Sequence, residues 1–147
     1  MLRITGRVKE IFKTSMGKYI SPQLIENKFK ESPFIDQIIV LGENQKFAAA
    51  LIVPDFEYLR NWCREKDIPY TTNSQVIKQP EIIARFKKEV KSYNKNFGDT
   101  EKIKKFELLD HEWTIETGEI TANLKLKRSY IHNKYASLID RIFNNQA

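Results

Sequence analysis

Apolar and β-branched residues gather in two neighbouring runs, at 34–41 and 47–53, and these runs predict a pair of strands. Turn-forming residues at 42–45 (Gly-Glu-Asn-Gln) separate the runs, so the two strands are predicted to pair as an antiparallel hairpin. Ile103, Phe106 and Leu108 indicate another strand. The three strands together predict a small mixed or antiparallel sheet.

In four other segments the apolar residues recur every three or four positions, which is the spacing of one helix face. The apolar positions of these segments are Leu24, Ile25 and Phe29; Phe56, Leu59, Trp62 and Cys63; Ile82, Ile83, Phe86 and Val90; and Ile131, Tyr135, Leu138, Ile139 and Ile142. Ser21 and Asp55 are good N-caps, and Pro22 and Pro80 suit the first position of a helix. With the strands, these helices predict an α+β fold in which helices pack on the faces of the sheet.

The first residues predict an additional small element. Residues 2–5 and 10–13 have strand character on either side of a Gly6-Arg7 turn, which predicts a small N-terminal β-hairpin. No linker, internal repeat or low-complexity tract divides the sequence. A chain of 147 residues is therefore expected to form a single domain over 1–147.

Composition excludes several classes of protein. Hydrophobic residues make up 41% of the sequence, enough for a packed core. No apolar run approaches the roughly 20 residues that cross a bilayer, and residues 1–20 lack the apolar core of a signal peptide. Cys63 is the sole cysteine, which fits a reducing, cytoplasmic environment. Two histidines and one cysteine offer no metal-ligand spacing, so no metal site is expected.

The net charge of +6 indicates a surface that attracts anions. Much of the excess lies between Lys78 and Lys105, where a solvated helix face is the favoured interpretation. Neither an aromatic stacking platform nor a reading helix is legible, and we expect no nucleic-acid partner. Two alternatives from other classes stay open: a basic module that binds nucleic acid or anionic membrane, and a non-catalytic domain that docks on a partner enzyme.

Two segments carry candidate chemistry. Residues 6–26 join a basic hairpin, with Gly17 in a lysine-rich turn, to a marked helix start. Residues 117–128 form a polar, turn-rich stretch that delivers Lys125 just before the last helix. A lysine on such a loop can bring a compact positive charge to developing anionic oxygens. On residue chemistry alone, an exposed basic loop before a helix is the better explanation of the second segment.

These two segments, in this order, resemble the C-terminal domain of AMP-forming acyl-CoA synthetases, within the long-chain fatty acid–CoA ligase branch. Residues 6–26 resemble the hinge and following loop of that family. The second segment is similar to the terminal catalytic loop, in which a threonine precedes the essential lysine by four residues and an arginine follows it by three. Thr121, Lys125 and Arg128 have that spacing. The chain departs from the family at Leu124, where many members have glycine, and at 121–123, where the branch usually has a Thr-Pro-Thr-like stretch.

The resemblance implies that residues 1–147 are the mobile C-terminal (lid) domain of an AMP-forming ligase. Residues 1–20 would form its hinge and hairpin, and the large N-terminal ATP- and acyl-binding domain is absent. Lys125 would be the catalytic lysine of adenylation. Arg7 would bind the nucleotide ribose, and Lys9 would be the hinge. Lys13 and Gly17 would belong to the face that serves thioester formation with CoA.

The implied activity is the ATP-dependent conversion of a fatty acid to acyl-CoA. The full-length enzyme would use ATP (giving AMP), CoA and Mg²⁺, none of which is expected to bind tightly to this chain alone. Its implied partners are the large N-terminal domain and the substrates fatty acid, ATP and CoA. The ATP-gripping loop and the acyl tunnel belong to the large domain in the family, so we expect the isolated chain to be inactive. Peripheral membrane association of the full-length protein is compatible with this assignment.

Overall fold

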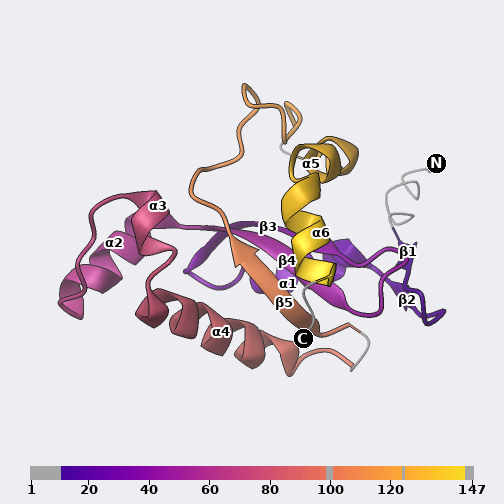
Figure 1. Cartoon of the computed structure of the whole chain (residues 1–147), viewed down its shortest axis with the longest axis horizontal. Helices are drawn as coiled ribbons and strands as arrows, with labels where there is room; N and C mark the ends of the chain where they lie inside the picture. Colours follow the sequence, from indigo (N-terminus) through magenta and orange to yellow (C-terminus); the bar gives the residue numbers. More distant parts are fainter. Residues whose placement is uncertain (1–10, 99–100, 124, 145–147) are drawn as a thin grey trace.

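The computed structural model describes residues 11–98, 101–123 and 125–144, which form a three-stranded sheet, helices on both of its faces and a separate two-stranded hairpin (Figure 1). The fold is therefore α+β, as the sequence predicts. None of the helices in these ranges is both long enough and apolar enough to cross a membrane.

The sheet has the order β3-β4-β5, with β3 at Ile35–Leu41, β4 at Ala48–Pro54 and β5 at Ile103–Leu108. β3 and β4 pair antiparallel, which confirms the hairpin predicted from the turn residues between them. β4 and β5 pair parallel, so the sheet is mixed. A parallel pair needs a crossover, and the chain supplies it with three helices between β4 and β5.

Those helices are α2 (Phe56–Glu65), α3 (Asn73–Val76) and α4 (Pro80–Asn94). Asp55 caps α2 by accepting a hydrogen bond of 3.1 Å from the Tyr58 amide, as its position predicts. α3 was not predicted, because four residues are too few to show an apolar period.

The central strand β4 divides the core into two halves. All seven of its residues are buried, and successive side chains point to opposite faces of the sheet. Ile38, Val40, Ala48, Ala50 and Ile52 face the side covered by α1 (Pro22–Phe29), α2 and α4. Ile39, Leu41, Ala49, Leu51 and Val53 face the side covered by the last two helices. Burying each large aliphatic side chain on this strand contributes about 1.5–3 kcal/mol.

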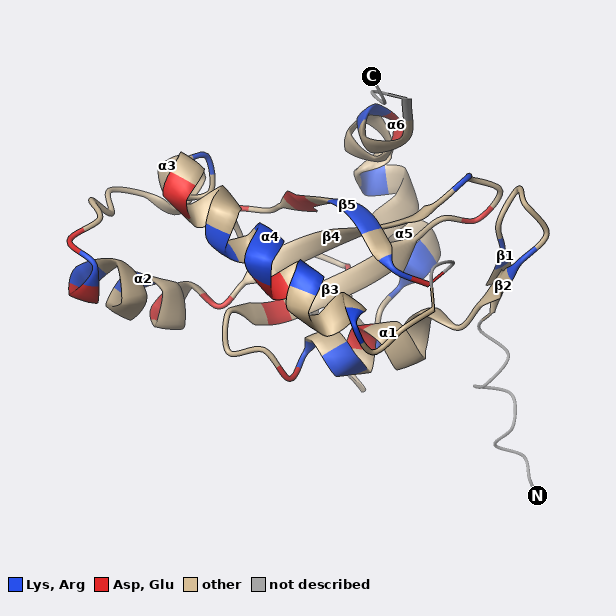
Figure 2. Ribbon diagram, turned by 90° about the horizontal axis from the view of Figure 1, so that it is seen from below, with Lys and Arg blue, Asp and Glu red and all other residues tan. Residues whose placement is uncertain are grey.

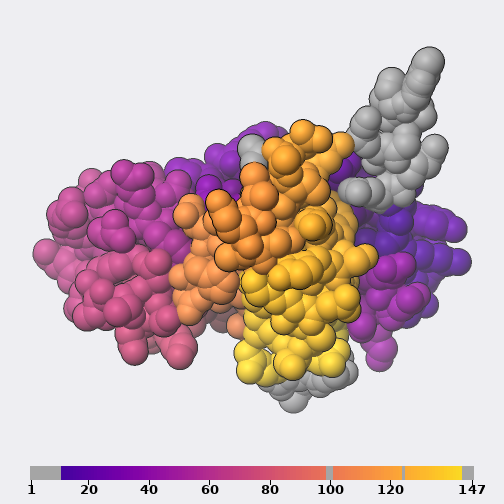
Figure 3. Space-filling model, turned by 90° about the horizontal axis from the view of Figure 1, so that it is seen from above, coloured from indigo at the N-terminus to yellow at the C-terminus, as the bar shows by residue number. Residues whose placement is uncertain are grey.

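The second face is covered by α5 (Arg128–Lys134), α6 (Ala136–Asn144) and the segment that precedes them. Figure 3 shows that this segment, in orange, packs beside the two helices, in yellow. Trp113 of this segment is 2% exposed and belongs to the same apolar cluster as Ile131 and Ile142.

Two helix predictions need correction. The last helix is predicted to be continuous through Tyr135, but the structure interrupts it there and forms α5 and α6. The Tyr135 hydroxyl hydrogen-bonds with Trp113 and Glu119, at 3.3 Å in each case, so contacts distant in sequence hold this residue at the interruption. Leu24, one of the apolar positions of the first helix, does not join the core and is 68% exposed.

The N-terminal hairpin is confirmed only in part. Residues 2–5 and the Gly6-Arg7 turn lie outside the part of the chain that the structure describes. Phe12–Lys13 (β1) does form a strand, and it pairs antiparallel with Tyr19–Ile20 (β2), a partner that the sequence did not indicate. Pro22 opens α1 as expected, although the Ser21 side chain makes no capping hydrogen bond.

Candidate functional site

Lys125 lies on a short loop whose two arms are joined by backbone hydrogen bonds. The Lys127 amide donates to the Glu119 carbonyl at 2.7 Å, and the Thr121 amide donates to the Lys125 carbonyl at 2.8 Å. Ile120 and Leu126 form an isolated antiparallel bridge between these bonds. We call residues 119–127 the lysine loop. Its arms pair like two strands, so the backbone at residue 125 has a defined position.

Thr121 fixes the tip of the lysine loop through its side chain. Its hydroxyl oxygen accepts hydrogen bonds from the amides of Asn123, at 3.2 Å, and Lys125, at 3.1 Å. The four-residue spacing between threonine and lysine therefore has a structural reason: the hydroxyl holds the lysine's own amide across the turn.

The Lys125 side chain is exposed, and the residue borders a cavity of about 420 Å³ between the lysine loop and α1. Gln23 and Asn27 of α1 line the opposite wall, and Asp36 and Gln37 close one side. A fixed backbone with a solvent-accessible ammonium can present its charge to a molecule outside this domain.

Arg128 follows the lysine loop and anchors it to the core. Its guanidinium donates two hydrogen bonds of 2.7 Å to the carboxylate of Glu26 on α1. Glu26 is 5% exposed, and it also accepts a bond of 2.8 Å from the Val40 amide on β3. One buried carboxylate thus connects the lysine loop, α1 and the sheet. Such a bidentate pair is geometrically specific as well as strong.

Sequence reasoning missed Glu26. The signal was present, because Pro22, Ile25, Glu26 and Phe29 are the buried residues of α1, and a glutamate within a buried stripe needs a cationic partner. Only the fold identifies Arg128, 102 positions later, as that partner.

Glu119 anchors the other arm of the lysine loop and is completely buried. The Lys134 ammonium lies 2.5 Å from its carboxylate, and the Thr117 hydroxyl and Tyr135 hydroxyl also donate to it. Burial raises the pKa of Glu119, but the bonds from Lys134 and Thr117 outweigh burial, so its pKa lies below the ordinary value. The same bond raises the pKa of Lys134. The carboxylate is therefore held in its charged form.

The segment before the lysine loop is tied to β3. The Gln37 side chain donates to the Trp113 carbonyl at 3.0 Å and accepts from the Trp113 amide at 2.7 Å. These two hydrogen bonds have the pattern that a paired strand would make with Trp113, and they fix the position of the backbone that leads to residue 119.

Lys13 and Gly17 lie on the β1–β2 hairpin, and both are exposed. Gly17 has a φ of +83°, the left-handed conformation that favours glycine, and a Cβ added there would meet no atom within 4 Å. The hairpin is tied to the β3–β4 turn, because the Asn44 amide donates to the Lys13 carbonyl and the Ser15 amide donates to the Gln45 carbonyl, each at 2.9 Å.

The predicted site residues therefore fall into two groups. In Figure 1 the hairpin with Lys13 and Gly17 lies at the right-hand end, whereas the chain leading into the lysine loop arches over the top of the sheet. Lys125 borders the cavity against α1. Phe12, the residue before Lys13, borders a different cavity of about 430 Å³ beside α5. Arg7 and Lys9 lie outside the described residues, and their roles stay predictions.

Comparison with known proteins gives a family for this architecture. The family model described as "AMP-binding enzyme C-terminal domain" matches residues 9–147. The long-chain-fatty-acid–CoA ligase FadD15 of Mycobacterium tuberculosis is 35% identical over 146 residues, which are 99% of this chain and 24% of that protein. Human long-chain-fatty-acid–CoA ligase 1 is 30% identical over 146 residues, covering 97% of this chain and 21% of its own length. The chain thus spans less than a quarter of these curated relatives.

Solved structures share the fold at low identity. The A domain of the carboxylic acid reductase from Segniliparus rugosus, in complex with AMP and a co-purified carboxylic acid, has a TM-score of 0.76 at 19% identity. The match covers 95% of this chain and 20% of that one. The adenylation domain of the carboxylate reductase from Mycobacterium chelonae has a TM-score of 0.73 at 20% identity, covering 91% and 19%.

The Glu26–Arg128 pair gives a first prediction. An Arg128→Met substitution leaves Glu26 buried without its guanidinium partner, and we expect the free energy of unfolding to fall by about 3–5 kcal/mol in urea titration. The exposed Arg64→Met is the matched control and should change stability little. The double variant Glu26→Gln/Arg128→Met buries no charge and keeps an oxygen for the Val40 amide, so it should recover part of the loss. Equal losses in the single and double variants would contradict this assignment.

A second prediction concerns acid stability. Because the folded pKa of Glu119 is lowered, its ionised form stabilises the fold above the unfolded pKa of about 4.3, and this contribution is lost as pH falls through the lower folded pKa. We expect Glu119→Gln to reduce stability at neutral pH and to flatten the acid limb of a plot of unfolding free energy against pH. Glu116→Gln, at an exposed position of the same segment, should leave the curve unchanged. An unaltered acid limb in Glu119→Gln would refute the role of this carboxylate.

Proposed function

Because this chain belongs to the family of AMP-binding enzyme C-terminal domains, we propose that it is the small, mobile domain of a long-chain fatty acid–CoA ligase. In this proposal it works with a larger nucleotide- and acyl-binding domain and contributes to the ATP-dependent activation of a fatty acid to acyl-CoA. The observation that carries the proposal is the exposed Lys125 on a loop whose backbone is fixed at both ends.

The first half-reaction joins a carboxylate to the α-phosphate of ATP and releases pyrophosphate. This step brings the negatively charged oxygens of the carboxylate and the phosphate close together. The Lys125 ammonium would neutralise that charge, and a positioned cation is most effective when it needs no reorganisation at the moment of reaction. Three features supply such positioning: the pairing of the loop arms, the Thr121 hydroxyl and the Glu26–Arg128 ion pair.

The second half-reaction transfers the acyl group from AMP to the thiol of CoA. We propose that the domain turns about Lys9, withdraws Lys125 and presents the hairpin that carries Lys13 and Gly17. The small, exposed turn at Gly17 has space around it and would let another surface approach the backbone closely. Exchanging the two surfaces gives one active site two successive environments.

The substrates and the metal are assigned mainly to the large domain. Arg7 would contact the ribose of ATP and AMP. Within the described ranges, no three His, Cys, Asp or Glu side chains come together as metal ligands, so we place the Mg²⁺ that accompanies ATP with the large domain. We therefore propose that the isolated chain does not form acyl-CoA from ATP, CoA and fatty acid. The buried free thiol of Cys63 is consistent with our placement of the enzyme in the cytoplasm.

Lys125→Ala in the enzyme that carries both domains tests the adenylation role. We expect ATP–pyrophosphate exchange to fall by about 10²–10³-fold, because one preorganised positive charge is lost. CoA transfer from a supplied acyl-adenylate should be retained. Lys127→Ala, at another exposed lysine of the same loop, is the control and should change neither assay strongly. Retained exchange in Lys125→Ala would refute the proposal.

Gly17→Leu tests the thioester role and should give the opposite pattern. A leucine adds bulk where the hairpin would approach the nucleotide, so CoA transfer should fall while ATP–pyrophosphate exchange is kept. The change also strains the backbone, because φ is +83°. Gly17→Asn is therefore the matched variant, since asparagine tolerates this conformation and adds less bulk. If both variants lose both half-reactions in proportion to their loss of stability, the effect is structural and the assigned role is wrong.

A further inference from the structure

A groove follows β5 on the side away from β4. β5 is the edge of the sheet within the described residues, and no other strand of this part of the chain pairs with that side. Two cavities of about 490 and 500 Å³ lie along it, and they share the lining residues Ile83, Phe106, Glu107 and Arg141. The cavities therefore form one continuous groove, which we call the β5 groove.

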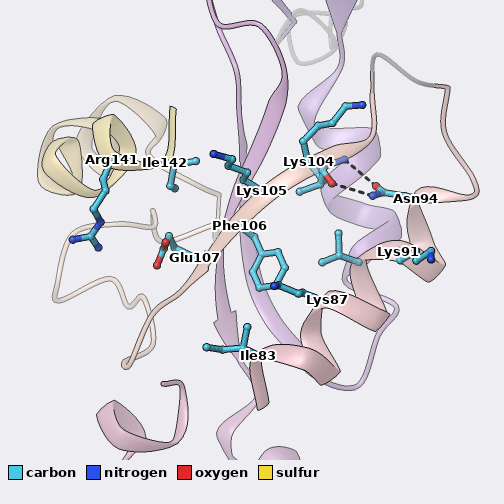
Figure 4. A pocket seen from close by; sticks show the side chains of 12 residues that line it. Ile83, Lys87, Lys91, Asn94, Lys104, Lys105, Phe106, Glu107, Arg141 and Ile142 are labelled. Carbon is cyan, nitrogen blue, oxygen red and sulfur yellow. Dashed lines mark hydrogen bonds between the residues drawn. The ribbon is translucent and has the colours of Figure 1, made fainter. Parts of the chain in front are cut away.

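The β5 groove has an apolar floor between two helices. Figure 4 shows Ile83 of α4 beside Phe106 of β5, with Ile142 of α6 on the other side of the strand. Ile83 and Phe106 are only half-buried, although both continue the apolar pattern of their elements. Leu138 of α6 lines the second cavity. The groove therefore offers apolar contact along its length.

The rim of the groove is mostly cationic. Its basic residues are Lys78, Lys87, Lys91, Lys104, Lys105 and Arg141. Its acidic residues are Glu107 and Asp110, and Asp110 already accepts a hydrogen bond from Ser74 and lies 2.8 Å from His111. Figure 2 shows the blue segments of α4 and β5 on the same side of the molecule. This rim complements a negatively charged occupant.

At one end of the groove a side chain already pairs with β5. The Asn94 carboxamide accepts a hydrogen bond of 2.9 Å from the Ile103 amide and donates one of 3.0 Å to the Ile103 carbonyl, drawn as dashed lines in Figure 4. These are the two bonds that a neighbouring strand would make. Asn94 therefore ends the groove at Ile103 and leaves the rest of the strand edge beyond it.

We infer that the β5 groove binds an extended acidic segment of a partner protein, which adds as a further strand beside β5. One set of alternate side chains would place carboxylates toward Lys87 and Lys91 of α4, and the other set would place apolar groups toward Leu138 and Ile142 of α6, while the backbone pairs with the strand edge. This binding surface is independent of the adenylation role of Lys125.

The form of the groove favours this occupant over two others. A bilayer surface is flat and would meet the rim but not the recessed Phe106 floor. A second copy of the same strand in parallel register would place Lys104 and Lys105 against their own counterparts, and such like charges oppose that pairing. An acidic strand neutralises these lysines instead.

The test uses the 147-residue chain and a fluorescent peptide that alternates Glu and Val and is about as long as β5. Anisotropy titration should show saturable binding, which Lys87→Ala/Lys91→Ala weakens by about 10-fold. Lys88→Ala/Lys95→Ala removes the same charge from α4 and its C-cap, outside the groove lining, and should leave affinity unchanged. A peptide N-methylated at every residue keeps its side chains but has no N–H to donate from either edge, and it should not bind.

Three results would overturn the inference. Equal binding of the N-methylated peptide would show that strand pairing is not used. Equal weakening by the two double variants would show general charge attraction without a groove. Binding to phosphatidylserine vesicles, or self-association in sedimentation, that Lys87→Ala/Lys91→Ala abolishes while the peptide fails to bind would assign the surface to a membrane or to a second copy.

Discussion

The buried carboxylate of Glu26 is the constraint on which the candidate site depends. It accepts two bonds from Arg128 and one from the Val40 amide, so a helix, a strand and the end of the lysine loop meet at one side chain. A buried charge is tolerated only when it is paired and hydrogen-bonded, and here the pairing helps to fix the position of the loop. Glu119 does the same at the other arm, with Lys134 as its cation.

These two ion pairs explain how an exposed loop can be positioned accurately. Apolar packing holds the sheet, where every residue of β4 is buried. In the lysine loop, directional bonds add to the packing of Ile120 and Leu126 against the core. The two buried carboxylates pair with Arg128 and Lys134, and not with Lys125. The exposed charge of Lys125 that other molecules can contact is therefore separate from the charges that maintain the structure.

Local sequence patterns predicted much of the fold. The strands β3 and β4 have the apolar runs of a covered sheet, and Asp55, Pro22 and Pro80 mark helix starts by their own chemistry. The interruption at Tyr135 was not predictable, because the apolar stripe of residues 131–142 continues through it and the side-chain partners of Tyr135, Trp113 and Glu119, are distant in sequence. In the candidate site, Lys125 was selected through the family resemblance, from its spacing to Thr121 and Arg128, and its catalytic role stays a prediction. The ion pair that anchors the lysine loop could not be identified from the sequence, since Glu26 and Arg128 are 102 positions apart.

The backbone bonds between the β1–β2 hairpin and the β3–β4 turn have a mechanical consequence. They join Gly17 to the same rigid sheet that holds Lys125 through Val40 and Glu26. In the proposed cycle, one rotation of the domain would therefore move the hairpin and the lysine loop together. Bringing one of them to the active site would withdraw the other, so the enzyme would need no separate signal to keep its two chemical steps from overlapping.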